Sequence, residues 1–215
     1  AAGNWPFQET DCALKSLRLN GSNGYLSRAF ASAGSRTTWS LSCWIKRANL
    51  DTNGTIWASS TLSSIRFSGG NGIEWLFSGT YGLFTSNRFR DPSAWAHYLF
   101  VFDSSNSVAD DRQRIYLNNE LLTAYDQRSN QGLNSTPEFN SAQTHAIGAK
   151  TDGSVPLGGG IAEVQFIDGQ ALTPDAFTFI DGQGIIQPKR FTGDYSSGPV
   201  YSNFLTGGID SSYPA

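Results

Sequence analysis

The carboxylates are the first residues to test for chemistry, because two of them on one face of a strand can act as general acid and base. Retaining glycoside hydrolysis needs two carboxyl groups about 5 Å apart. None of the glutamates lies two or four positions from another carboxylate within a predicted strand; they are Glu9, Glu74, Glu120, Glu138 and Glu163. Glu163 and Asp168 are separated by an odd number of positions, so strand alternation points them to opposite faces. The sequence therefore does not support a glycosidase.

Nucleophilic catalysis has no better support. The two histidines, His97 and His145, lie in strand-like segments, and the sequence contains no Gly-x-Ser-x-Gly turn. The glycine run at 158–160 precedes a strand rather than a helix, so it lacks the helix N-terminus that a phosphate-binding loop uses. We therefore expect a protein that is not an enzyme and that carries no cofactor.

Calcium is the metal for which the sequence offers candidate ligands. Asp103, Asp110 and Asp111 flank a loop at 104–109 that is rich in Ser and Asn, and oxygen ligands on a loop suit calcium. The alternative, which we favour, is a solvated loop whose aspartates cap turns and pair with neighbouring arginines. These arginines are Arg112 and Arg114.

The two cysteines, Cys12 and Cys43, leave two interpretations open. They can be separate buried thiols, which behave as small apolar groups. They can also form one disulfide that ties the N-terminal segment to an inner strand. Two cysteines cannot build a zinc site unaided.

Aromatic residues are the candidates for ligand binding, because sugars stack on flat rings. Trp57, Trp75 and Tyr81 lie in the strand-rich first half of the chain and could form such a platform. Aromatic residues at alternate strand positions more often belong to a core, and this is the interpretation that we favour for each of them. Trp44 lies on the polar face of its strand, and we expect it to contact another chain.

The charge pattern argues against two classes of partner. The formal net charge is -3, and no run of Lys or Arg supplies the basic stripe that nucleic-acid binding requires. No stretch approaches 18 apolar residues, so we expect no membrane span. The 39% hydrophobic and 13% aromatic content is enough for one core, and we expect a single domain over 1–215 with its core at about 14–204.

Alternation of apolar and polar residues predicts the secondary structure. In 39–47, Trp39, Leu41, Cys43 and Ile45 share one face, which is typical of a half-buried strand. Further strands are predicted at 55–58, 64–67, 73–77, 81–85, 95–103, 114–117, 120–122, 145–148, 160–167 and 200–204.

Two connections have clear turn or helix signals. Asn118-Asn119 predicts a two-residue hairpin turn, since Asn tolerates positive φ. Thr173, Pro174 and Asp175 predict the start of one short helix over 173–180.

Five segments of the chain resemble parts of laminin G-like, concanavalin A-like domains. The opening strands 24–28 and 39–47 are similar to those of the family, and so are 90–97 and the hairpin 114–119, although the usual Gly of that turn is Asn119. The block 160–174 resembles the closing strand and short helix of a subgroup that is common in marine bacteriophages. The resemblance implies an all-β, antiparallel two-sheet sandwich, or jelly roll.

The same resemblance implies a non-enzymatic virion surface protein, such as a capsid decoration, an appendage or a tail fibre. Its partners would be other virion proteins in an oligomeric assembly, or a glycan on the host surface, and its location the virion surface or the extracellular space. A lectin-like carbohydrate-binding module is the alternative hypothesis, and a glycoside hydrolase the third. One fold hosts many functions, so the choice depends on the site.

Overall fold

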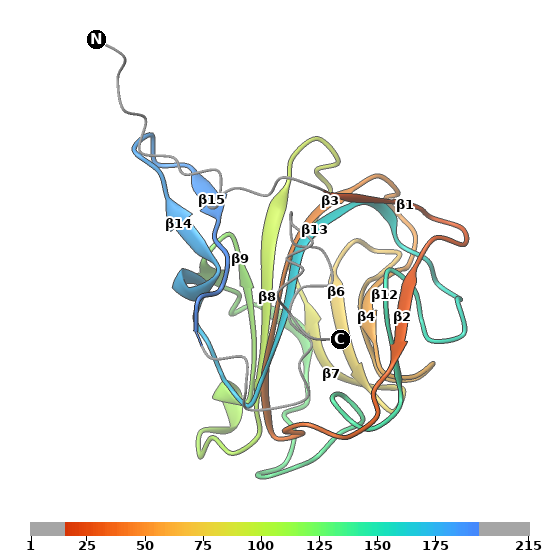
Figure 1. Cartoon of the computed structure of the whole chain (residues 1–215), viewed down its shortest axis with the longest axis vertical. Helices are drawn as coiled ribbons and strands as arrows, with labels where there is room; N and C mark the ends of the chain where they lie inside the picture. The colour runs from red at the N-terminus through yellow and green to blue at the C-terminus, as the bar shows by residue number, and fades with distance from the viewer. Residues whose placement is uncertain (1–15, 194–215) are drawn as a thin grey trace.

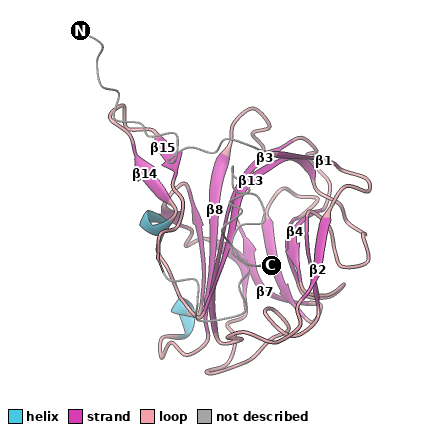
Figure 2. Ribbon diagram, in the orientation of Figure 1, coloured by secondary structure: helices cyan, strands magenta, loops and turns pink. Residues whose placement is uncertain are grey.

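The structure is a computed structural model that describes residues 16–193. Strands dominate this part of the chain, and its helical structure consists of two short 3-10 turns, η1 (Ala109–Asp111) and η2 (Pro174–Ala176). Figures 1 and 2 show two large sheets facing each other and a small hairpin outside one of them. The predicted all-β sandwich is confirmed.

The six-stranded sheet has the order β1, β13, β3, β8, β9, β10, and every neighbouring pair is antiparallel. Its strands are β1 (Leu17–Asn20), β3 (Thr38–Arg47), β8 (Ala96–Asp103), β9 (Gln113–Leu117), β10 (Glu120–Leu121) and β13 (Gly158–Asp168). The alternation predicted for 39–47 holds, because Trp39, Leu41, Cys43 and Ile45 all belong to the core between the sheets. Ser40, Ser42, Trp44 and Lys46 therefore lie on the outer face of this sheet.

The seven-stranded sheet has the order β11, β7, β6, β5, β4, β12, β2 and is also antiparallel. Its strands are β2 (Leu26–Ala29), β4 (Gly54–Ala58), β5 (Ser64–Phe67), β6 (Ile73–Phe77), β7 (Thr80–Thr85), β11 (Tyr125–Arg128) and β12 (Thr144–Ile147). Its inner face presents residues such as Ile65, Phe67, Ile73 and Trp75 to the core.

The core between the sheets is built around Trp39, which is fully buried. Its ring centroid lies 5.2 to 5.7 Å from five other aromatic centroids, those of Trp57, Trp75, Phe102, Phe139 and Phe166. Each such ring removes about 200 Å² from water, which at about 25 cal/mol per Å² is an upper figure of roughly 5 kcal/mol. Aromatic burial is therefore a large contribution to the free energy that holds the sheets together.

The β9–β10 turn confirms the predicted hairpin. Asn118 and Asn119 have φ values of 47° and 71°, as a two-residue turn with both central residues in the left-handed region requires. Asn is one of the few residues that adopt this region at low cost, so the absence of the usual glycine leaves the turn intact.

The predicted helix at 173–180 is wrong in extent. Only η2 is helical, and the chain then forms β14 (Thr178–Ile180), which pairs with β15 (Ile186–Pro188). Thr173 makes no capping bond to the backbone, because its hydroxyl donates to Asp175 Oδ1 instead. Burial of Phe177 against Phe191 and the strand pairing of Thr178 override the local helix signal.

The outer face of the six-stranded sheet is covered in part by this C-terminal segment. Phe177 and Phe191 pack on Leu99, Val101 and Ile167 in a second apolar cluster. The hairpin β14–β15 projects from this cover beyond the sandwich (Figure 1).

Two further predictions concern a membrane-spanning segment and a strand near the C-terminus. Within 16–193 no helix has the length and apolar character needed to cross a membrane. The strand predicted at 200–204 lies outside the described residues.

Candidate functional site

Trp57 and Trp75, two of the three residues predicted to form a ligand platform, lie in the core. They expose 2% and 0% of their surfaces. Trp57 contacts Phe139 and Phe166 at centroid distances of 5.1 and 4.8 Å, and Trp75 lies 5.7 Å from Phe77. Neither indole can present a face to a ligand, so both serve the core, the interpretation that the sequence pattern favours.

Tyr81, the third predicted residue, has a different position. It lies on β7 opposite Leu76, on the face of the seven-stranded sheet that points away from the core, and it is half-buried. Its ring stacks on that of Phe84, which is also half-buried, at a centroid distance of 5.8 Å and an interplanar angle of 24°. The pair forms a small aromatic surface on the outside of the sandwich.

A β-bulge at Gly82 brings these two rings to the same face. Tyr81 pairs with Leu76 and Leu83 with Trp75, so Gly82 is the extra residue. A Cβ added to Gly82 would lie 2.7 Å from the Phe77 ring, which is too close, so this position favours glycine. Without the bulge, simple alternation would place Tyr81 with Leu83 rather than with Phe84.

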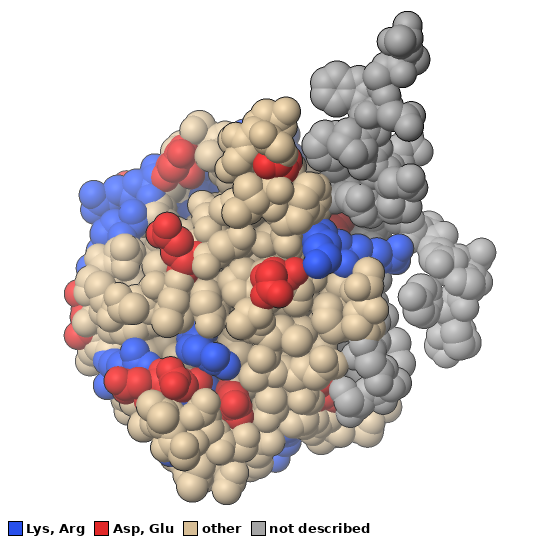
Figure 3. All heavy atoms as spheres, turned by 90° about the vertical axis from the view of Figure 1, so that its left-hand side faces the viewer, with Lys and Arg blue, Asp and Glu red and all other residues tan. Residues whose placement is uncertain are grey.

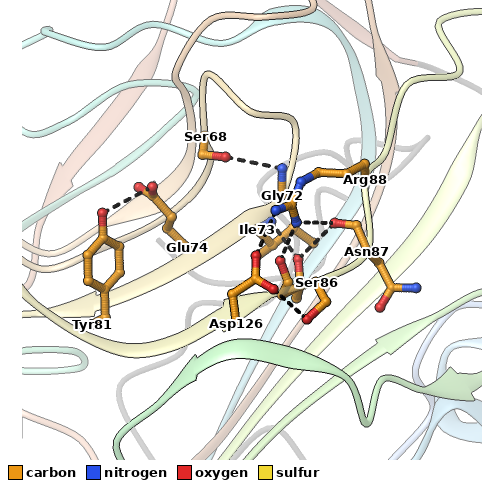
Figure 4. Close-up of polar contacts among 10 residues, drawn as sticks. Ser68, Gly72, Ile73, Glu74, Tyr81, Ser86, Asn87, Arg88 and Asp126 are labelled. Carbon is orange, nitrogen blue, oxygen red and sulfur yellow. Dashed lines mark hydrogen bonds and ion pairs between the residues drawn. The ribbon is translucent and has the colours of Figure 1, made fainter.

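Charged groups border the aromatic pair at the Tyr81 end. Glu74 on β6 accepts a hydrogen bond from Arg66 Nε at 2.6 Å. It accepts another from the Tyr81 hydroxyl at 3.3 Å (Figure 4). Burial and the neighbouring Glu74 carboxylate raise the pKa of Tyr81, so its hydroxyl remains protonated. The Glu74 and Arg66 side chains expose only 8% and 16%, which makes this ion pair rigid.

The Phe84 end has a second, more exposed group of charges. The Arg88 guanidinium lies over the Phe84 ring, 5.3 Å from its centroid, and donates to Asp126 Oδ2 at 2.6 Å. The Ser86 hydroxyl donates to the other Asp126 oxygen at 2.7 Å (Figure 4). Hydrogen bonds from Arg88 and Ser86 lower the pKa of Asp126 and keep it ionised.

We call this surface the Tyr81 strip and define it by Arg66, Glu74, Tyr81, Phe84, Ser86, Arg88 and Asp126. Two guanidinium groups and two carboxylates are paired in it, so its formal charges cancel. The strip occupies the β5–β6–β7–β11 part of the outer face. Further along the same face, Ser64, Ala58 and Ala146 are buried, so the accessible part of the sheet ends near β5.

Trp44 lies on the outer face of the six-stranded sheet, as its strand pattern predicts, but it exposes only 9% of its surface. Its ring lies 5.5 Å from that of His97 on the neighbouring strand. Burial removes the reason for assigning Trp44 to an interface with another chain.

The predicted calcium residues are not gathered into a site. Asp103 accepts a hydrogen bond from the Ser105 hydroxyl at 2.5 Å, and Asp110 pairs with Arg128 at 3.2 Å and accepts from Asn130 at 2.6 Å. Asp111 lies in the turn η1. Among residues 16–193, no three His, Cys, Asp or Glu side chains are close enough to hold a metal ion.

The Cys43 thiol is free and fully buried, and burial raises its pKa far above the usual range. Cys12, its partner in the disulfide alternative, lies outside the described residues.

His97 forms a pair with Ser42 that the sequence did not suggest. Ser42 Oγ and His97 Nε2 are hydrogen-bonded at 2.9 Å, and the two residues expose 1% and 0% of their surfaces. Burial lowers the pKa of His97 to about 3 and that of His145 to about 4, so both imidazoles are neutral. A substrate has no access to this buried pair, and none of the described residues gives His97 Nδ1 a hydrogen bond that could orient the ring for catalysis.

Comparison with known proteins gives a consistent result for the fold. Residues 20–176 match the concanavalin A-like lectin/glucanases superfamily. No curated protein matches the sequence.

Solved structures share the architecture at low sequence identity. Domain 4 of AbnA, a GH43 extracellular arabinanase from Geobacillus stearothermophilus in complex with arabinotriose, has a TM-score of 0.54 at 21% identity, over 74% of this chain and 73% of that one. A putative carbohydrate binding protein from Bacteroides ovatus has a TM-score of 0.53 at 15% identity, over 80% and 58%. The LG4-5 domains of the mouse laminin alpha1 chain have a TM-score of 0.50 at 12% identity, over 85% and 48%. These identities establish the fold alone.

Proposed function

Because the chain belongs to the concanavalin A-like lectin/glucanases superfamily, we propose that it is a non-enzymatic domain that binds carbohydrate on the Tyr81 strip. The observation that carries the proposal is the half-exposed Tyr81–Phe84 ring pair with ionised hydrogen-bonding groups at both ends. The apolar face of a sugar packs on aromatic rings, and its hydroxyls need fixed donors and acceptors around them.

The charge balance of the strip favours a neutral sugar. Each guanidinium group already has a carboxylate partner, at 2.6 Å in both pairs. An added anion would have to compete with these partners, whereas a hydroxyl can share a carboxylate oxygen or an unused N–H group.

The same pairs support a binding role rather than hydrolysis. A glycosidase needs one carboxyl group that is protonated at the working pH. Hydrogen bonds from Arg88 and Ser86 lower the pKa of Asp126 and hold it ionised. Both carboxylate oxygens of Glu74 already accept hydrogen bonds, one from Arg66 and one from Tyr81. Neither group is placed to donate a proton to a leaving oxygen.

The test is titration with neutral oligosaccharides, starting with arabinotriose and extending to a glycan array. Tyr81→Ala should abolish binding of whichever neutral oligosaccharide the native protein binds, and its far-UV circular dichroism should be unchanged. Tyr25→Ala is the matched control, since Tyr25 is exposed by 37% and is not part of the strip. Equal affinity in both variants, or no neutral ligand at all, would contradict the proposal.

A second candidate function is a role on the surface of a virus particle, in assembly or in adhesion to a host. It starts from the resemblance of 160–174 to marine bacteriophage proteins. One observation favours an assembly role: Ile180 and Ile185, at the end of the projecting β14–β15 hairpin, expose 64% and 57% of their surfaces. Figure 3 shows acidic and basic groups interspersed on a largely uncharged surface on this side of the molecule, which suits packing against other proteins.

This candidate is tested by the oligomeric state. Replacement of Ile180 and Ile185 by Ser should shift the protein from an assembly to a monomer in sedimentation, without loss of glycan binding. A native protein that is monomeric and binds no other virion protein would contradict it.

A further inference from the structure

Three neighbouring strands place a glycine between two cationic residues on the outer face of the six-stranded sheet. Gly160 on β13 pairs with Lys46 on β3 and with Arg18 on β1. Residues adjacent to all three belong to the core or pack against it, among them Ile45, Leu19 and Ile161, so the row itself points outward. The two cationic residues flank the glycine at one strand spacing, about 5 Å on each side.

Trp95 fills the space above this glycine. A Cβ added to Gly160 would lie 2.7 Å from Cη2 and 3.0 Å from Cζ2 of the Trp95 indole. The indole therefore lies against the backbone of Gly160, and any larger residue at position 160 would displace the ring. Trp95 exposes 39% of its surface, whereas Trp39, Trp44, Trp57 and Trp75 expose at most 9%. Among residues 16–193 it is the tryptophan that a ligand can reach.

The two cationic residues that flank Gly160 differ from the arginines of the Tyr81 strip in having no ion pair in the described part of the chain. Neither Lys46 nor Arg18 takes part in any of the three ion pairs of the described residues. Arg18 is exposed and Lys46 is half-buried. Lys46 contributes to lowering the pKa of Asp91, but that carboxylate accepts its hydrogen bonds from Ser93, at 2.7 and 2.5 Å.

We propose that Trp95, Lys46 and Arg18 form a second carbohydrate site, which takes an anionic saccharide that carries a carboxylate or sulfate group. The indole would pack against the sugar ring, and the two cationic side chains would bind the acidic group from both sides. This site lies on the opposite sheet from the Tyr81 strip and differs from it in chemistry, because neither Lys46 nor Arg18 forms an ion pair within residues 16–193, whereas both arginines of the strip do. The anionic-saccharide site can therefore be confirmed or refuted separately from the neutral-sugar site.

The test compares three polysaccharides, namely polygalacturonate, dextran sulfate and neutral dextran, in titrations followed by tryptophan fluorescence and calorimetry. The native protein should bind at least one of the two anionic polymers and not the neutral one, with an affinity that falls as salt is added. Whichever of the two binds identifies the acidic group, and failure of both would overturn the proposal.

Variants separate a saccharide site from general attraction of a polyanion. Lys46→Gln and Arg18→Gln should each weaken binding by about tenfold. Lys150→Gln, the same kind of change on a loop outside the site, should not weaken it. Trp95→Ala should weaken it similarly, and Trp95→Phe should restore part of the affinity. Loss through the charge variants with full binding by Trp95→Ala would overturn the proposal, since it would show attraction of charge alone. Tyr81→Ala should leave the anionic ligand bound.

Discussion

The outer faces of the two sheets differ in what covers them. On the six-stranded sheet, Leu99, Val101 and Ile167 point outward, and the chain buries them under Phe177 and Phe191. On the seven-stranded sheet, the β6–β7 part of the outer face carries Tyr81, Phe84 and paired charges and remains accessible.

The difference shows how one architecture separates stability from binding. Burial of the outward-pointing aliphatic residues lowers the free energy of the folded state, and the C-terminal segment buries them permanently. Polar side chains fix the cover in place: Ser40 Oγ donates to Gln170 O at 2.7 Å, and the Gln165 side chain accepts from Phe191 N at 2.9 Å. Aromatic residues with satisfied polar neighbours can stay open at low cost, so they are the part of the surface left for a ligand.

Truncation of one aromatic residue on each face should have the largest and most unequal effects on stability. Phe177→Ala should lower the free energy of unfolding by about 3–5 kcal/mol, because Phe177 is 1% exposed and its loss leaves a cavity. Tyr81→Ala should cost less than about 1 kcal/mol, because a half-buried side chain on an open face leaves no closed cavity. Urea denaturation measures both, and equal losses would show that the faces do not differ.

The second prediction concerns pH. In the native state His97 and His145 remain neutral down to about pH 3 and pH 4, whereas in the unfolded chain they take up a proton near pH 6.5. The unfolded state therefore binds more protons as the pH falls, and the free energy of unfolding should be about 2–3 kcal/mol lower at pH 5.5 than at pH 7.

A histidine variant locates this effect. His97 lies on the outer face of the six-stranded sheet and His145 in the core beside Trp57, so His97→Leu should remove about half of the pH dependence. Urea titrations at the two pH values measure it. A profile that is the same in the variant and the native protein would show that His97 takes up its proton without unfolding.

The third prediction tests the rigid end of the Tyr81 strip. Glu74→Ala leaves the Arg66 guanidinium without its partner at 16% exposure, and should cost about 1–2 kcal/mol because solvent screens part of the unpaired charge. Glu120→Ala, on exposed β10, is the matched control and should be neutral. If both variants are equally stable, the Arg66–Glu74 pair does not hold the strip.

The smallest effect on stability is expected at the exposed end of the strip. Arg88→Ala should leave the urea midpoint unchanged, since Arg88 and Asp126 side chains are 33% and 40% exposed. Its affinity for the neutral sugar should nevertheless fall by about tenfold, because a charged hydrogen-bond donor over Phe84 is lost. An unchanged affinity would confine the binding surface to Tyr81 and its neighbours.

The strand pattern carried much of the fold but little of the site. Alternation in 39–47 identified the core face of β3, and Asn118-Asn119 identified a hairpin turn, because both signals are local. Trp75 and Tyr81 looked alike as sites, since alternation does not tell which face of a strand is covered. The sequence did not identify Phe84 as a neighbour of Tyr81 on the outer face. The bulge at Gly82 changes the spacing of two outward-pointing residues from two positions to three. A glycine inside a predicted strand is the signal that could have revealed it.

The sandwich, the Asn118-Asn119 turn and the shortage of catalytic carboxylate pairs could be predicted from the sequence, because they depend on residue types and on spacings of a few positions. Tertiary structure decided which surfaces stayed open. Arg88 reaches Asp126 across 38 positions only because β7 and β11 pair, and Trp95 lies over Gly160 only because β13 runs beside β3. Such contacts depend on long-range strand order, which no local pattern encodes.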